Sequence, residues 1–499
     1  MNYLKAKKNL LIGFFGQLLI LILGIVLPRF VLVSFGSEVN GLLSTVTQVY
    51  TYLALLQAGI GNASINLLYK YLSCDDKKNI LYVVSATKLY FRKLSKIYLG
   101  LIFFVAVLFP ILTTSNIERN TIFAIIILQG LPSFIYFYFV SAYEQLLIAE
   151  GENYILSSLN VILRILTTSI KIILIYLGSN IIIVQLAFCI VSCLKSVFLF
   201  FYIKSKYKWL KLDLKNADIS ILTERKAFLT HEVSNTIFNS TDLITLSIFC
   251  GMTVASVYSV YNLVFSAISI LISTINNSIY YILGQTFHKN NSLYICVHDT
   301  YEIFYLALIF SFFSSAYILI TPFILLYTKG VVDVNYVNLY LPILFTIVQL
   351  LSCSRAISAK LIAISGHARN TQKNTIIEAV INLTVSIILV NLIGIYGVLI
   401  GTIIALLYRS NDIIIYANKK ILRRSPKKIY LVLLVNYLVF LFIVIISQNI
   451  TLSILNYAQF VKYGFIISIF VFFLYFFINI IINIKQIKLM MIKINIIKK

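Results

Sequence analysis

The chain has few charged residues and few of the groups that usually form soluble active sites. Asp, Glu, Lys and Arg make up 12% of its 499 residues, whereas hydrophobic residues make up 60%. A typical soluble domain has about twice that charged share. The sequence contains no glycine-rich nucleotide loop followed by Lys and Ser or Thr, which excludes an ATPase motor of that kind within this chain.

Histidine and cysteine are also scarce. The four histidines are not spaced as metal ligands, and the six cysteines show neither metal-ligand nor disulfide spacing. Cys189 and Cys193 share a helix face, but two small buried hydrophobic side chains explain that spacing better than a metal site does. The sequence therefore predicts no metal site, no cofactor and no catalytic centre.

Long apolar stretches fill the chain instead. A stretch of about 20 apolar residues crosses the hydrocarbon core of a bilayer, because lipid cannot satisfy unpaired backbone groups. The first stretch is too long for the core of a signal peptide and has no cleavage site after it, so it is expected to be a retained helix. The fold class expected is an all-α polytopic membrane protein with about fourteen transmembrane helices. The predicted spans are Leu10–Val33, Leu42–Leu68, Ile97–Leu112, Ile122–Ile148, Ile155–Leu177, Ile181–Ile203, Ala227–Cys250, Val254–Ile282, Ile303–Tyr327, Leu339–Ile364, Thr375–Ile393, Ile395–Ala417, Ile429–Ser447 and Val461–Ile484.

The formal charge of +24 follows from membrane topology rather than from nucleic-acid binding. With the N-terminus inside, 31 of the 41 Lys and Arg residues fall on the cytoplasmic side, four on the outer side and six within spans. Positive residues accumulate on the cytoplasmic side of membrane proteins. The expected protein has both termini in the cytoplasm and does not bind nucleic acid.

The chain also resembles itself at an offset of about 215 residues. Because the offset covers six spans, the two copies have the same orientation, as in transporters with two parallel lobes and alternating access. The alternative is a duplicated membrane scaffold without a transport role. The predicted domains are an N-lobe over 1–208, a linker over 209–226, a C-lobe over 227–420, and two further helices with a basic tail over 421–499. The matched positions include Gly36 with Gly251, Asn62 with Asn277, Gly151 with Gly366, and Gly178 with Gly394.

Ionisable residues within spans are the main candidates for function, since charge at membrane depth is costly and usually faces a bundle interior. Arg164 and Lys171 lie seven residues apart in the fifth span, about 20° apart around the helix. This cationic stripe predicts a phosphate-attracting face, which suits the planar guanidinium of arginine. For Lys171 the alternative is a side chain that extends to the outer interface.

Polar stripes on three other spans predict a shared cavity. The seventh span has His231, Asn235, Asn239 and Asp242 within an arc of about 80°. Asp242 is a candidate for a proton or cation site, or for the partner of a cation in the cavity; structural hydrogen bonding between helices is the alternative. The eighth span contributes Asn262, and the second contributes Gln48 and Asn62 as candidate sugar contacts.

The tenth to twelfth spans contain further charges. Glu378 is a candidate for ion coupling or for a charge partner, at nearly the same level as Arg164 when the repeats are superposed. Arg355 and Lys360 lie about 140° apart around one helix, so at most one of them is expected to face the cavity. Arg409 and Asp412 are interpreted as a structural pair at i,i+3.

These residues occur in a pattern that resembles the polysaccharide (O-antigen) flippases of the multidrug/oligosaccharidyl-lipid/polysaccharide exporter superfamily. The resemblance covers the chain and is carried by Pro28-Arg29-Phe30, Phe35-Gly36, Gly41-Leu42, Gln48, Leu55-Leu56, Gly59-Ile60-Gly61, Asp242, Val257-Tyr258, Glu378, Asn382, Gly394, Gly397 and Gly401-Thr402.

The resemblance implies movement of an undecaprenyl-pyrophosphate-linked oligosaccharide from the inner to the outer leaflet of a bacterial cell membrane. Its pyrophosphate would contact Arg164, Arg29 or Arg355, with Lys171 as a further candidate. The resemblance also implies a lipid-tail role for the last two helices. Coupling to H⁺ or Na⁺ is expected, as are contacts with membrane lipids and with polysaccharide assembly machinery.

Two alternatives share this fold: a multidrug/cation antiporter and a flippase for the peptidoglycan precursor. A different class would be a membrane polysaccharide polymerase or an acyltransferase. The polymerase calls for a large outer loop, and the outer loops here are very short. The acyltransferase calls for a histidine within the membrane, for which His231 is the candidate.

Overall fold

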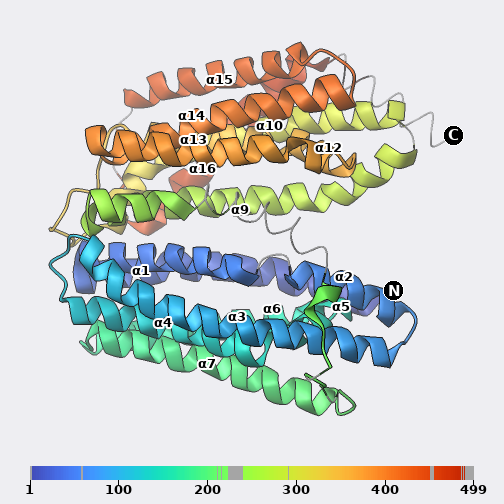
Figure 1. The fold of residues 1–499 in the computed structure, drawn as a ribbon. Helices are drawn as coiled ribbons and strands as arrows, with labels where there is room; N and C mark the ends of the chain where they lie inside the picture. The colour runs from blue at the N-terminus through green and yellow to red at the C-terminus, as the bar shows by residue number, and fades with distance from the viewer. Residues whose placement is uncertain are drawn as a thin grey trace. The chain divides into compact units, whose positions relative to one another are not determined.

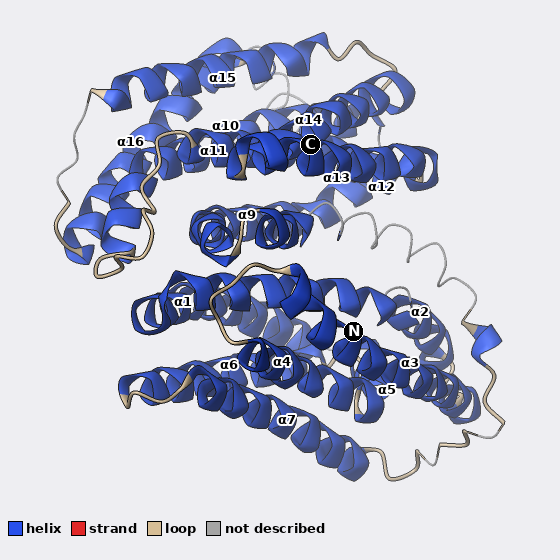
Figure 2. Cartoon of the chain, turned by 60° about the vertical axis from the view of Figure 1, so that its left-hand side comes forward, coloured by secondary structure: helices blue, strands red, loops and turns tan. Residues whose placement is uncertain are grey.

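The computed structural model describes residues 3–57, 60–210, 212–214, 216–222, 236, 240–289, 291–449, 454–484, 486 and 488. Over these residues the chain forms helices and loops and no strand (Figures 1 and 2). The helices are α1 (Tyr3–Ala54), α2 (Ile60–Ser73), α3 (Lys77–Leu112), α4 (Arg119–Phe139), α5 (Ser141–Ala149), α6 (Asn153–Tyr176), α7 (Ile181–Lys206), α9 (Met252–Lys289), α10 (Asn291–Tyr327), α11 (Leu341–Ser354), α12 (Ala356–Ile364), α13 (Gln372–Ile393), α14 (Ile395–Tyr416), α15 (Lys427–Gln448) and α16 (Tyr457–Ile482), with a shorter apolar helix at Ser240–Phe249.

Twelve described segments, with α11 and α12 counted together as one, are long and apolar enough to cross a membrane. The 52 residues of α1 would extend about 78 Å as one straight rod, more than twice the thickness of a hydrocarbon core. Gly36 divides α1 with φ 82° and ψ 178°, a conformation available essentially to glycine alone. With α1 counted as two spans, and with Ser240–Phe249 as the described part of the seventh predicted span, the structure confirms the predicted polytopic fold.

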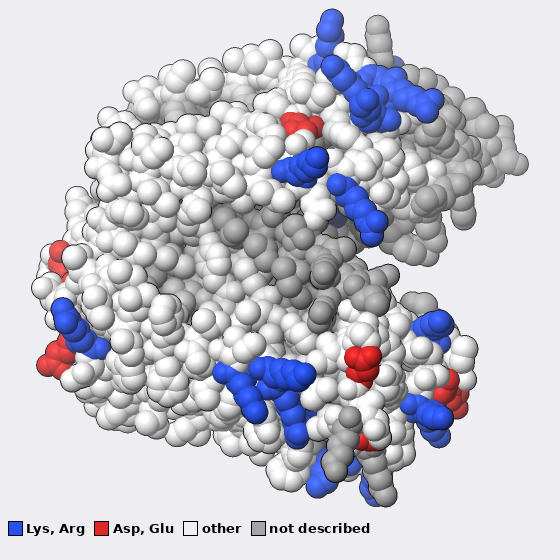
Figure 3. Space-filling view, viewed as in Figure 1, with Lys and Arg blue, Asp and Glu red and all other residues white. Residues whose placement is uncertain are grey.

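The chain forms two compact units, Met1–Val257 and Tyr258–Lys499. In the first unit α1 packs on α6, α3 on α4, and α4 on α7; in the second, α13 packs on α14, and α10 on α11, α15 and α16. The predicted lobe and linker boundaries remain predictions. Figure 3 shows that the Lys and Arg side chains visible in each unit lie mostly towards one end of its helices, next to a broad surface without charge.

The internal repeat recurs in the backbone. Two nine-residue helices, α5 and α12, begin 215 residues apart, at Ser141 and Ala356. The repeat also preserves backbone conformation, because a glycine with positive φ occurs at each of three matched pairs of positions. These pairs are Gly36 with Gly251, Gly151 with Gly366, and Gly178 with Gly394.

Both short helices follow a break in a membrane-spanning segment, and polar side chains satisfy carbonyls near each break. Before α5, the Lys88 ammonium of α3 donates to the carbonyls of Tyr138 and Phe139 at 2.6 and 2.7 Å. Before α12, the Ser410 hydroxyl of α14 donates to the Leu351 carbonyl at 3.1 Å. Because no water satisfies such groups in a bilayer, these bonds make each break tolerable.

Glycine brings α13 and α14 together. Gly397 and Gly401 lie one turn apart on α14, as in the small-xxx-small contacts of membrane helices. A Cβ atom added at Gly401 would lie 2.8 Å from the backbone nitrogen of Ser386. The close approach lets the Asn382 amide donate to the Thr402 hydroxyl at 2.9 Å.

We expect Gly401→Ala to destabilise the second unit by about 1–3 kcal/mol, since the added methyl group overpacks the α13–α14 contact. The measurement is thermal unfolding of the purified protein in detergent. Gly100→Ala is the matched control, because a Cβ at this helical glycine meets nothing within 4 Å. Equal unfolding midpoints for the two variants would contradict the close approach.

Candidate functional site

Four charged side chains form a network in the second unit, in which two are buried and two are half-buried. Glu378 of α13 is 4% exposed and Arg409 of α14 is 6% exposed. The Arg355 guanidinium, at the break between α11 and α12, donates to Glu378 Oε1 at 2.6 Å. Arg409 Nε lies 3.5 Å from the other Glu378 oxygen, and Arg409 also pairs with Asp412. The predicted Arg409–Asp412 pair is thus present as part of a larger network.

Uncharged groups complete this network. Arg409 donates to the Thr375 hydroxyl at 2.8 Å, and the Asn374 amide donates to Asp412 at 2.6 Å. The two cations and the two carboxylates balance in charge. Their pairing offsets the desolvation cost of burying charged groups. A phosphate that approached Arg355 would compete with Glu378. The roles predicted for Arg355 and Glu378 in substrate binding and ion coupling remain predictions.

Lys171 of α6 is buried inside the first unit, at 8% exposure. Its ammonium donates to Gln185 Oε1 of α7 at 3.3 Å and lies 4.4 Å from the centre of the Phe188 ring. The side chain therefore points towards α7.

Arg164 lies two turns before Lys171 and is half-buried, on the side of α6 that faces α1. A Cβ added at Gly24 of α1 would lie 3.9 Å from one guanidinium nitrogen. Among the residues that the structure describes, the buried Nε atom of Arg164 has no hydrogen-bond partner. Arg29, the third predicted phosphate contact, is half-buried on α1.

The segment Ser240–Phe249 packs along the second half of α1 through polar pairs. Thr45 and Ser247 share a hydrogen bond of 2.5 Å, and the Tyr52 and Thr241 hydroxyls are also bonded. Asp242 is 7% exposed and lies beside Tyr52. These bonds are made by Thr241 and Ser247, which are not part of the predicted stripe, so both interpretations of Asp242 remain predictions.

The other predicted sugar contacts are only partly described. Gln48 is half-buried, one turn from Thr45 on α1, and Asn262 is half-buried on α9. His231, Asn235 and Asn239 lie outside the described residues, as does the side chain of Asn62.

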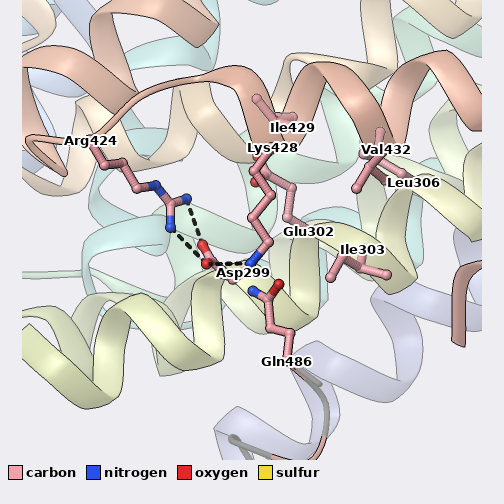
Figure 4. Close-up of a pocket in the computed structure, with 9 residues that line it drawn as sticks. All are labelled: Asp299, Glu302, Ile303, Leu306, Arg424, Lys428, Ile429, Val432 and Gln486. Atoms are coloured by element: carbon pink, nitrogen blue, oxygen red, sulfur yellow. Dashed lines mark hydrogen bonds and ion pairs between the residues drawn. The ribbon is translucent and has the colours of Figure 1, made fainter. Parts of the chain in front are cut away.

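A second charged cluster was not predicted. His298, Asp299 and Glu302 lie on α10 and are 1%, 8% and 5% exposed. Figure 4 shows Arg424 and Lys428 converging on Asp299. The predicted ninth span begins at Ile303, whereas α10 begins at Asn291, so these residues fell outside the predicted spans. The spacing of His298 and Glu302 at i,i+4 was the signal that could have identified a common face.

This cluster is the one group of His, Cys, Asp and Glu among the described residues with ligand atoms within 4.8 Å of one another. The two Arg424 terminal nitrogens occupy both oxygens of Asp299, at 2.6 and 2.7 Å. A neighbouring guanidinium disfavours a metal cation, so the donor set does not fit a metal centre.

Comparison with known proteins identifies the fold. No protein-family description and no curated sequence matches the chain. The solved structure of the lipid II flippase MurJ in an inward closed conformation is similar to it, with a TM-score of 0.69 and 15% identity over 96% of this chain and 99% of that one. An inward-facing multidrug resistance MATE family transporter of the MOP superfamily has a TM-score of 0.61 and 17% identity over 83% and 96%. An outward-facing structure from that family has a TM-score of 0.52 and 15% identity over 83% and 96%.

The chain therefore has the fold of membrane transporters and flippases of the MOP superfamily. It is a multi-pass membrane protein, and its solved structural relatives transport or flip rather than catalyse. This confirms the fold that the sequence resemblance implied. The O-antigen specificity in that resemblance stays a prediction.

We expect Glu378→Ala to lower the free energy of unfolding by about 3–5 kcal/mol, because it leaves the buried Arg409 and the half-buried Arg355 without their shared carboxylate. The measurement is thermal unfolding in detergent. Glu118→Ala is the control, since Glu118 is exposed and makes no side-chain cap hydrogen bond. Matching midpoints for the two variants would show that the network contributes little.

Proposed function

We propose that the protein is a flippase that moves an undecaprenyl-pyrophosphate-linked oligosaccharide from the cytoplasmic to the outer leaflet of a bacterial cell membrane. The main observation in support of the proposal is the large share of this chain that is covered by its structural likeness to the lipid II flippase MurJ. The MurJ likeness covers 96% of this chain, whereas the MATE likenesses leave 17% uncovered, about the length of residues 421–499.

Residues 421–499 contain α15 and α16, which pack on α10. The Tyr475 hydroxyl of α16 and the Ser314 hydroxyl of α10 lie 2.9 Å apart, and Asn436 and Asn479 exchange amide hydrogen bonds of 2.8 and 3.2 Å between α15 and α16. Buried amide pairs of this kind strengthen helix association in lipid. Two further helices attached to a transporter unit suit a substrate with a long lipid tail.

The cationic side of the first unit suits the phosphate end of such a substrate. Arg164 is half-buried, and its buried Nε has no hydrogen-bond partner among the described residues. Arginine binds phosphate oxygens with two parallel N–H donors. Arg164 is therefore proposed as the principal phosphate contact, with Arg29 and Arg355 as further contacts. The buried Lys171 is proposed to add positive electrostatic potential near Arg164.

Transport is proposed to proceed by alternating access, coupled to H⁺ or Na⁺. The MATE structures of the same fold are solved in inward-facing and outward-facing conformations, which supports such a cycle. Both termini are proposed to lie in the cytoplasm, and polysaccharide assembly proteins are proposed partners.

A second candidate function, a flippase for the peptidoglycan precursor, is favoured by the name of the MurJ relative alone. Expression of this chain in three bacterial strains separates the candidates: one without its O-antigen flippase, one depleted of its lipid II flippase, and one without its multidrug exporters. The proposal predicts restored surface polysaccharide in the first strain only. Rescue of growth in the second, or of drug resistance in the third, would assign the alternative instead.

We expect Arg164→Ala to abolish surface polysaccharide in the first strain while the protein remains in the membrane, because the substrate loses its principal phosphate contact. The measurement pairs polysaccharide gels with immunoblots of membranes. Arg119→Ala is the control, since Arg119 is an exposed cation at the start of α4. Normal polysaccharide from a stably inserted Arg164→Ala protein would remove this assignment.

A further inference from the structure

The two carboxylates of the α10 cluster are in different surroundings. Asp299 is bound by the Arg424 fork, and the Lys428 ammonium of α15 lies 3.5 Å away. Arg424 is itself positioned by Asn418, whose side-chain oxygen accepts from Arg424 Nε at 2.9 Å. The charge of Asp299 is therefore matched, and the ion pairs attach the start of α15 to α10.

Glu302 has no such direct ion pair among the described residues. It is 5% exposed, and its carboxylate accepts a hydrogen bond from the Ser358 hydroxyl of α12 at 3.4 Å. One turn earlier, the His298 ring is 1% exposed, and its Nε2 atom has no hydrogen-bond partner within the described part of the chain. A ring nitrogen of His298 and an oxygen of Glu302 lie within 4.8 Å of each other.

Glu302 also lines a cavity that reaches the protein surface. The cavity has a volume of about 20 Å³, enough for one water molecule. Its lining includes Asp299 and Lys428, and the Lys428 side chain is 51% exposed. Figure 4 shows Glu302, Lys428 and Gln486 around this space. A water molecule here would connect the buried carboxylate with bulk solvent.

The first copy of the internal repeat has no charge at the positions that match this cluster. Residues 215 positions earlier on α3 are Val83, Val84 and Thr87, which correspond to His298, Asp299 and Glu302. Asp299 has an explanation in the attachment of α15, which has no counterpart in the first copy. Glu302 and His298 do not take part in the bidentate contact with Arg424.

We propose that Glu302, assisted by His298, is a proton-exchange site of the second unit, which takes up a proton from solvent through the cavity beside it. This inference rests on the proposed transport function and assigns its coupling ion as H⁺. The charged and titratable groups that surround Glu302, together with the uncharged polar groups that face the same space, are His298, Asp299 and Tyr294 of α10, Arg424 before α15, Lys428 of α15, Ser358 of α12, and Gln486 after α16.

The exchange is a simple proton transfer. A hydronium ion in the cavity gives its proton to a Glu302 carboxylate oxygen and leaves as water; the reverse step returns the proton. Protonation removes a negative charge from the contact with Ser358 and weakens the bond that this hydroxyl donates. Since α12 follows Arg355 of the Glu378 network, the proton would act on the contact between α10 and a helix next to that network.

The test is infrared difference spectroscopy on the purified, full-length protein without substrate, between acidic and alkaline buffers. We expect a band from a protonated, buried carboxyl group that Glu302→Gln lacks and Glu118→Gln retains, because Glu118 is exposed. An unchanged band in a folded Glu302→Gln protein would overturn the proposal.

Ser358→Ala provides a second variant that leaves Glu302 in place. Loss of the hydroxyl donor should shift the frequency of the Glu302 band, and an unshifted band would overturn the assignment even if Glu302→Gln did not fold. Because the spectra require no transport, a missing band would refute the proton site alone. A failure of polysaccharide rescue would instead refute the transport function.

Discussion

The structure depends on one constraint: a polar group inside a bilayer must find its partner within the protein, since lipid offers none. The network of Glu378, Arg355 and Arg409 meets this requirement with ion pairs between three helices. Lys171 meets it with an amide and an aromatic ring, and Lys88 with two carbonyls freed by a helix break. Each partner comes from another helix, so satisfying these groups also fixes the packing within each unit.

The same constraint explains why irregular backbone recurs at matched positions. Gly36 and Gly251, 215 residues apart, both have a positive φ, and α5 and α12 begin at that same spacing. A helix break is costly in lipid unless its carbonyls are satisfied. The two copies use different donors, lysine in one and serine in the other, which indicates that the break itself is the feature common to both.

Much of the fold could be predicted from the sequence, because membrane spans and internal repeats can be recognised from local hydrophobicity and from the spacing of residues. The polytopic class, the repeat and the Arg409–Asp412 pair all followed from such patterns. Pairing between distant helices did not: nothing local connects Glu378 with Arg355, or Asp299 with Arg424. The α10 cluster was missed for a related reason, since a charged helix end resembles a solvated connection until the helix that covers it is known. The orientation of Lys171 depended likewise on Gln185 of the next helix.

The most direct test of the proposed function is leaflet exchange in liposomes that contain only the purified protein and a labelled undecaprenyl-pyrophosphate oligosaccharide. The fraction of substrate that a membrane-impermeant reagent can reach is followed over time. We expect exchange many times faster than in protein-free liposomes, and faster than for lipid II under the same conditions. Exchange no faster than in protein-free liposomes, from protein shown to be folded and inserted, would contradict it.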